Sequence, residues 1–175
     1  MPYYHGTDAD LAAGEEMRAY DHEEAVVDDE LHLAEELALM TFDLFKPADA
    51  ISRQEAIYLA ERPEDCKALG AWGDNVYEVE PIGAVESHSS GWFDLVFDAV
   101  LRHAVEEWER GNGAYSAWIN IHPHEWPTPE VEAMCRDYWA GLAPPGEVVY
   151  KQEHLCLAAK VVARVLEEPG ERLAI

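Results

Sequence analysis

The stretch Tyr3-Tyr4-His5-Gly6-Thr7-Asp8-Ala9-Asp10-Leu11, near the start of the chain, carries the features that determine how we expect the chain to fold. An aromatic pair suited to a strand leads into His5-Gly6-Thr7, and polar turn residues follow. We therefore predict a short strand that meets a loop at this tripeptide, where ligand-binding groups usually lie. Gly6 allows a ligand to approach the backbone, while His5 and Thr7 supply hydrogen-bonding groups beside it. A buried strand end with a satisfied histidine is the alternative interpretation.

A resemblance to a known family extends this interpretation. The run His5-Gly6-Thr7, with Ala9-Asp10-Leu11 and Gly14-Glu15 after it, resembles the opening of ADP-ribosyltransferases, especially the small rifamycin-modifying ones. A second block resembles the strand, helix and strand that follow in that family, and it comprises Ala56 to Ala60, Arg62 to Ala68, and Asn75 to Pro81. Together the two blocks cover roughly the first half of the chain.

The resemblance implies an α+β fold with a split β-sheet and flanking helices, in a single domain spanning residues 1–175. A helical, Trp-rich segment at about residues 92–143 would then be an insertion that shapes the acceptor site or a partner surface. One domain also fits the length of the chain, which is sufficient for one well-buried core.

Charge is the most unusual property of the composition. The 36 Asp and Glu residues against 12 Lys and Arg residues give a formal net charge of −24. A field of this sign repels phosphate backbones, so we expect no direct binding of nucleic acid. Basic protein surfaces and cationic small molecules are the favoured partners, as is a DNA-binding protein that would accept an acidic surface in place of DNA.

Cysteine usage and hydropathy bear on the compartment. Cys66, Cys135 and Cys156 are an odd number, widely spaced and without a CxxC pair, so we expect buried free thiols in a reducing environment. No run approaches the roughly 18 apolar residues of a membrane span, and no signal peptide is recognisable. The sequence predicts a cytoplasmic protein, or one of the host cytoplasm if it is phage-encoded or delivered.

Apolar residues at helical spacing predict three helices. The first runs from about Asp29 to Phe45 and stops before Lys46-Pro47, with an apolar face of Leu33, Leu37, Met40 and Leu44. The second is a core helix from Trp92 to about Arg110, with a face of Phe93, Phe97, Val100, Ala104 and Trp108. The third begins at Thr128-Pro129-Glu130, an N-cap followed by proline, with a face of Val131, Met134, Tyr138 and Leu142.

Strands are predicted at Ala56 to Ala60, at Asn75 to Ile82, and over Glu147 to Tyr150 and Leu155 to Leu166. A helix from Pro63 that closes at Gly70 lies between the first two. Residues 12–28 are predicted to be a loop with one short helix, and residues 84–91 a loop.

The resemblance assigns a role to each donor-site residue. His5 would hydrogen-bond the adenosine-side ribose of NAD, Gly6 would hold the nicotinamide carboxamide, and Thr7 would support the ribose region. Tyr58 would stack on nicotinamide, and Trp72 would contribute to the pocket wall.

Cleavage of the glycosidic bond of NAD passes through an oxocarbenium-like ribose, which requires a carboxylate nearby. The resemblance places this carboxylate at the start of a late strand, where Glu147 stands, with Glu153 six residues later as an alternative. The rifamycin-modifying members point instead to a residue after the Val-Glu-Pro strand, here Glu86. Pro145 stands where protein-modifying members have a second Gln or Glu, which argues against arginine-type protein specificity.

Two other interpretations are set aside. His122 and His124 could share a metal ion, but no further ligand pair stands at a recognised spacing, so no metal is expected. Arg53 is wrongly placed, and no Ser-Thr-Ser follows, for the branch of the family that uses an arginine on its first strand.

The expected function is therefore transfer of ADP-ribose from NAD to a protein or small-molecule acceptor, with release of nicotinamide. Strong acidity favours a basic protein as the acceptor. Two alternatives stay open, a non-catalytic acidic interaction or inhibitor protein that mimics nucleic-acid charge on the same scaffold, and an NAD glycohydrolase.

Overall fold

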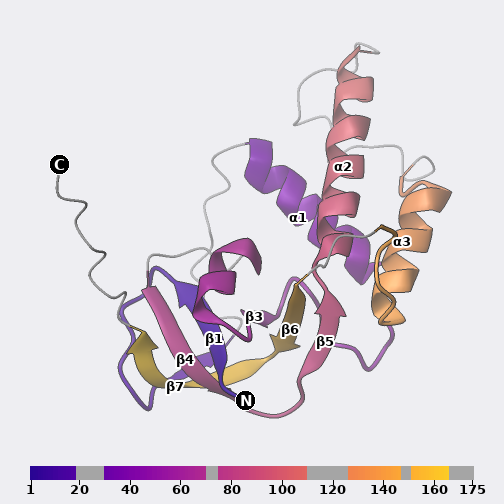
Figure 1. The fold of residues 1–175 in the computed structure, drawn as a ribbon. Helices are drawn as coiled ribbons and strands as arrows, with labels where there is room; N and C mark the ends of the chain where they lie inside the picture. Colours follow the sequence, from indigo (N-terminus) through magenta and orange to yellow (C-terminus); the bar gives the residue numbers. More distant parts are fainter. Residues whose placement is uncertain (19–29, 70–74, 110–125, 147–150, 166–175) are drawn as a thin grey trace.

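The computed structural model describes residues 1–18, 30–69, 75–109, 126–146 and 151–165 (Figure 1). These residues form a mixed α+β structure in which the helices gather beside two antiparallel sheets. The strands are β1 (Tyr3–Thr7), β2 (Glu16–Arg18), β3 (Ile57–Leu59), β4 (Asn75–Pro81), β5 (Glu86–Ser89), β6 (Gln152–Cys156) and β7 (Ala158–Val165). The helices are α1 (Glu30–Asp43), the 3₁₀ helix η2 (Pro63–Leu69), α2 (Gly91–Glu109) and α3 (Pro129–Trp139).

The larger sheet has the strand order β1-β4-β7-β2. In the pairing of β1 with β4, His5 lies opposite Tyr77 and Tyr3 lies opposite Val79. Facing residues of an antiparallel pair point to the same side of a sheet, so these four side chains share one face. Tyr77 and Val79 are buried on that face, which contributes to the core between the two sheets.

The smaller sheet has the order β3-β6-β5, and β6 is its central strand. Leu157 alone separates β6 from β7, so one continuous segment supplies an inner strand to each sheet. The smaller sheet is also joined to β1, because the backbone amides of Tyr4 and Ala60 each donate to the other residue's carbonyl, at 2.9 and 2.8 Å.

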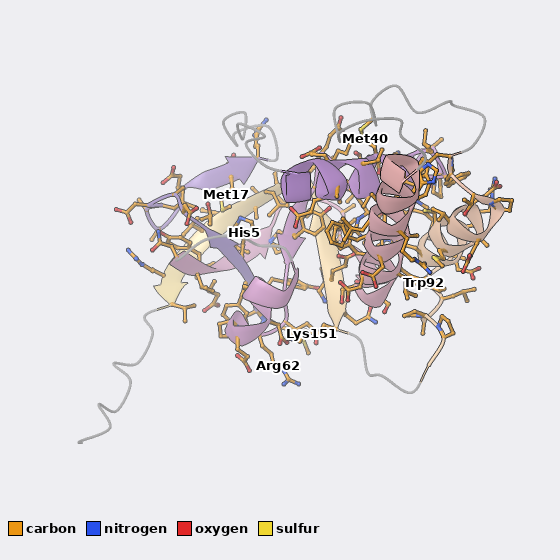
Figure 2. All side chains as sticks on the ribbon, turned by 90° about the horizontal axis from the view of Figure 1, so that it is seen from above. His5, Met17, Met40, Arg62, Trp92 and Lys151 are labelled. Carbon is orange, nitrogen blue, oxygen red and sulfur yellow. The ribbon has the colours of Figure 1, made fainter. Side chains whose placement is uncertain are left out.

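Two hydrophobic cores flank the smaller sheet. One lies between the two sheets, and its buried members are Met17, Ile57, Leu59, Tyr77, Val79, Cys156, Ala159 and Val161. The other joins the three α-helices, and its buried members are Ala34, Ala38, Phe42, Trp92, Val96, Val100, Val131, Cys135 and Tyr138. Figure 2 shows His5 and Met17 on the sheet side of the molecule and Met40 and Trp92 on the helical side.

The positions of the three α-helices that the structure describes were predicted correctly from capping residues, proline and helical spacing. The side-chain oxygen of Thr128 accepts a hydrogen bond from the amide of Val131, and Pro129 begins α3, which confirms the predicted N-cap. Helix α1 ends before Lys46-Pro47 and α2 covers the predicted span. The strands expected around Ala56, Asn75 and Leu155 are also confirmed.

The predicted buried face of α1 is wrong. Met40 and Leu44 are 50% and 66% exposed, whereas Ala34, Ala38 and Phe42 are fully buried. Leu37 is partly buried against the helical core, and the side chain of Leu33 lies outside the described residues. Likewise, Cys135 and not Met134 is fully buried beside Val131 and Tyr138 on α3, and Leu142 lies 52% exposed beyond its end.

Three other expectations need correction. Residues 84–91 were expected to form a loop, but they contain β5, which pairs with β6. By contrast, His5-Gly6-Thr7 forms the end of β1 and the loop begins at Asp8, so the predicted meeting of a strand and a loop at this tripeptide is confirmed. Residues 12–28 contain β2, and the predicted helix at Pro63 is a 3₁₀ helix. The insertion at about residues 92–143 stays a prediction, since residues 110–125 lie outside the described part.

Candidate functional site

His5 lies at the junction of the two sheets. It is 5% exposed, and its Nδ1 is 2.9 Å from the carbonyl oxygen of Tyr58 on β3. Since a carbonyl oxygen only accepts hydrogen bonds, Nδ1 carries the proton and donates it. The hydrogen bond therefore fixes the imidazole ring of His5 against the backbone of β3.

The residues that follow His5 are also held in place. Thr7 is buried, and its hydroxyl oxygen accepts a hydrogen bond from the amide of Ala9 at 3.2 Å. The phenol of Tyr77 on β4 donates to the carbonyl of Ala9 at 3.2 Å and accepts from the amide of Leu11 at 3.0 Å. The loop after β1 is thereby attached to β4.

Tyr58 directs its phenol away from His5. Its hydroxyl donates to the carbonyl of Arg53 at 2.7 Å, and the guanidinium carbon of Arg53 lies 5.4 Å from the centre of its ring. Burial raises the pKa of Tyr58 well above its ordinary value, although the charge of Arg53 acts in the opposite direction. The phenol thus belongs to a cluster on the helical side of β3.

The centre of that cluster is a buried ion pair between Arg53 and Glu153. Both Nη atoms of Arg53 donate to the Glu153 carboxylate, which also accepts a hydrogen bond from the Tyr138 hydroxyl at 2.8 Å. Four aromatic rings surround the guanidinium at 4.8 to 5.4 Å, namely Phe42, Tyr58, Phe93 and Tyr138. Burial opposes the positive charge, but the charge and hydrogen bond of Glu153, together with Tyr58 and Tyr138, outweigh it, so the pKa of Arg53 lies above its ordinary value.

These contacts bear on Glu153 as a candidate catalytic carboxylate. The residue is 1% exposed, and both of its oxygens accept hydrogen bonds from buried side chains. A carboxylate with these partners joins β6 to the helical layer. It stands on the same side of the smaller sheet as the Tyr58 phenol, since Arg53 contacts both.

Glu86 lies elsewhere, at a surface pocket of about 370 Å³. One carboxylate oxygen accepts a hydrogen bond from the amide of Ile51 at 3.0 Å, and the other lies 3.6 Å from Nε2 of His88. The pocket is lined by Pro47, Asp49, Ala50, Glu86, Ser87, His88, Trp139, Ala140 and Gly141. Neither His5 nor Tyr58 lines it.

A third polar group lies on the opposite side of β6. His154 is buried, and its Nδ1 is 2.7 Å from the hydroxyl of Ser87, its cross-strand neighbour on β5. Its Nε2 is 3.4 Å from the carboxylate of Glu61, and the ring of Tyr3 packs edge-on against it. Burial lowers the pKa of His154, and the charge of Glu61 partly offsets this effect.

The structure thus brings some predicted site residues together and separates others. His5, Gly6 and Thr7 share β1, and His5 contacts the backbone of Tyr58. The phenol of Tyr58, the carboxylate of Glu153 and the carboxylate of Glu86 do not face His5. Glu147 and Trp72, together with the possible metal ligands His122 and His124, lie outside the described residues.

Sequence analysis missed the importance of Arg53, His88, Tyr138 and His154. The sequence of β6 did contain a signal, because Glu153 and His154 are consecutive polar residues within a strand. Consecutive strand residues point to opposite faces of the sheet, so a strand buried on both faces must bury both side chains. Arg53 carries no such signal, because it lies in a polar connector between α1 and β3.

No protein-family model matches the sequence, and a search of curated proteins finds no match. Among the helices that the structure describes, none is both long and apolar enough to cross a membrane. Within the same residues, no group of three or more His, Cys, Asp or Glu side chains is placed to hold a metal ion.

Proposed function

We propose that the protein is an NAD-dependent ADP-ribosyltransferase with the split-sheet fold of that family. Nicotinamide leaves C1′ of the ribose of NAD, and a nucleophile of the acceptor forms the new bond at that carbon and loses its proton. A carboxylate stabilises the positive charge that develops on the ribose as the glycosidic bond breaks.

One observation carries the proposal. The two sequence blocks that resemble the family, separated by about fifty residues, meet at a single place, where Nδ1 of His5 donates to the carbonyl of Tyr58. Pairing of β1 with β4, which places His5 opposite Tyr77, brings the last part of the second block to the same place.

Glu147 is the carboxylate that we assign to catalysis. Glu153 is committed to Arg53 and Tyr138, and Glu86 lies at a pocket that does not include His5. Glu147 precedes β6 closely in the chain, and β6 pairs with β3, which carries Tyr58.

A second function is favoured by the position of the Tyr58 phenol. A transferase of this class would present His5 and Tyr58 to one pocket, but the phenol is hydrogen-bonded to Arg53 on the other side of β3. A non-catalytic acidic protein that covers a basic partner would need neither residue in a pocket. The net charge of −24 suits that role.

Release of nicotinamide from NAD by the purified protein, with and without a cell lysate, tests the proposal. Wild type is compared with His5→Ala, Glu147→Gln and Glu153→Gln, and with Glu16→Gln, an exposed residue of β2, as the matched control. We expect lysate-dependent release that His5→Ala and Glu147→Gln abolish while Glu16→Gln leaves it unchanged. Far-UV circular dichroism of each variant shows whether a loss of activity is only a loss of folding.

The contrary outcomes are distinct. Release that does not depend on lysate identifies a glycohydrolase, in which water is the acceptor. If the wild-type protein neither releases nicotinamide nor binds NAD, the proposal is overturned and the acidic interaction protein is favoured. If Glu153→Gln folds normally and alone abolishes release, the assignment of Glu147 is wrong.

A further inference from the structure

The pocket beside Glu86 is built by three separate parts of the helical side. Pro47, Asp49 and Ala50 follow α1, Glu86 to His88 belong to β5, and Trp139 to Gly141 end α3. Its volume of about 370 Å³ is within the range of sites that hold small molecules.

His88 is oriented by its neighbours. It is 7% exposed, its ring stacks on Tyr138 with centres 4.3 Å apart, and Trp139 packs edge-on against it. Its Nδ1 lies 3.1 Å from the carbonyl oxygen of Tyr138 and must donate a proton to it, because a carbonyl cannot donate. In the neutral imidazole Nε2 therefore carries a lone pair.

That lone pair faces another acceptor. Nε2 of His88 makes no hydrogen bond among the described residues, and the nearest carboxylate oxygen is Oε2 of Glu86, at 3.6 Å. Oε1 of Glu86 already accepts from the amide of Ile51, which holds the carboxylate in place. With the imidazole neutral, these two acceptors face each other across a short gap without a donor, and the burial of His88 makes the missing hydrogen bond costly.

A cationic nitrogen fits this gap. Points 3.6 Å apart can both lie within hydrogen-bonding distance of one nitrogen that carries two N–H groups. The Glu86 side chain is 25% exposed, so a ligand can approach from its side. Asp49 adds a second exposed carboxylate, and the indole of Trp139, fixed by a 2.8 Å hydrogen bond to the carbonyl of Phe42, supplies an aromatic wall.

We propose that this pocket binds the head group of an organic cation that carries N–H donors, an alkylammonium or a guanidinium. Glu86 Oε2 and His88 Nε2 accept its hydrogen bonds, and Asp49 and Trp139 add charge and an aromatic surface. A quaternary ammonium lacks the donors and is excluded. The inference does not rest on the proposed function, since neither His5 nor Tyr58 lines the pocket.

Binding of cadaverine, agmatine and choline is measured by calorimetry and by NMR of the histidine rings, at pH 8. Physiological ionic strength limits the long-range attraction of cations to an acidic protein, since charges are screened over about 8 Å. Glu86→Gln is the test variant, and Glu80→Gln, an exposed residue of β4 that does not line the pocket, is the matched control. Circular dichroism verifies that both variants fold.

We expect cadaverine or agmatine to bind and to shift the ring signals of His88. Glu86→Gln should weaken binding roughly tenfold or more, because a charge-assisted hydrogen bond is lost, and Glu80→Gln should leave it unchanged. Choline should bind far more weakly than either amine. A lysine- or arginine-containing peptide that binds more tightly than the free amines would identify a protein side chain as the source of the cation.

Three results would overturn the proposal. They are failure of cadaverine and of agmatine to bind, equal binding by Glu86→Gln and wild type, and equal binding of choline and cadaverine. The first would mean that the gap between Glu86 and His88 is not a site for an organic cation. The other two would mean that the overall negative field attracts cations without a specific site.

Discussion

Removal of Arg53 should destabilise the protein severely. In Arg53→Met the Glu153 carboxylate, 1% exposed, would keep only the hydroxyl of Tyr138 as a hydrogen-bond donor from the cluster. Loss of one partner of a buried ion pair typically costs about 3–5 kcal/mol. For a domain of this size we therefore expect the melting temperature to fall by roughly 6–20 °C.

A double-mutant cycle separates the ion pair from its surroundings. Glu153→Gln leaves the charge of Arg53 unpaired but keeps a neutral oxygen that can accept from Tyr138. The double variant Arg53→Met/Glu153→Gln contains neither charge, so we expect it to be more stable than Arg53→Met. We thus expect the coupling free energy between Arg53 and Glu153 to stabilise the folded state.

Urea denaturation followed by circular dichroism gives the free energies of unfolding, provided that the slopes of the four transitions agree. A loss below about 1 kcal/mol in Arg53→Met, or additive effects of the two substitutions, would refute the argument. The first result would mean that water reaches Glu153, and the second that the two charges do not interact.

Three more predictions follow from individual residues. Thr128→Ala should lower the free energy of unfolding by about 1 kcal/mol, whereas Thr128→Ser, which keeps the capping oxygen, should have little effect in the same denaturation assay. Burial raises the pKa of Cys66 and Cys156 to about 11 and that of Cys135 to about 12, so the native protein at pH 8 should react slowly with a thiol reagent and all three thiols should react after denaturation; rapid native reaction would contradict this burial. The pKa of His154 is lowered from 6.5, so as the pH falls the unfolded chain takes up a proton before the folded protein does. The stability that neutral His154 provides is therefore present above pH 6.5 and is lost as the pH falls towards the folded-state pKa. Wild type should lose more stability over that interval than His154→Gln.

How far the sequence predicts the fold depends on whether the signal is local. The N-cap at Thr128 and the end of α1 before Pro47 are written in neighbouring residues, and both were predicted correctly. Helix α1 carries two overlapping apolar stripes, and the alanines at 34 and 38 form the buried one. Small side chains on this stripe let α2 pack closely against α1. Which of the two stripes is buried is therefore decided by tertiary packing and not by the local sequence.

Strand β5 and the buried cluster show what local reasoning cannot provide. Glu86-Ser87-His88-Ser89 contains no apolar residue, and it is a strand because β6 lies beside it. Arg53 and Glu153 are separated by 100 residues, so no spacing rule connects them. His5 was singled out because its sequence resembles a family motif, yet the hydrogen bond to Tyr58 that orients it is equally non-local.

The segment from Gln152 to Val165 has a consequence for the order of folding. Without it β3 and β5 share no partner, and β2 has no neighbour in the larger sheet, whereas β1 and β4 can still pair. During synthesis these strands leave the ribosome long before the segment that unites them. Such late, long-range pairing makes folding slow. Until the segment emerges, the core between the two sheets lacks Cys156, Ala159 and Val161, and the high negative charge helps to keep the nascent chain apart from other chains.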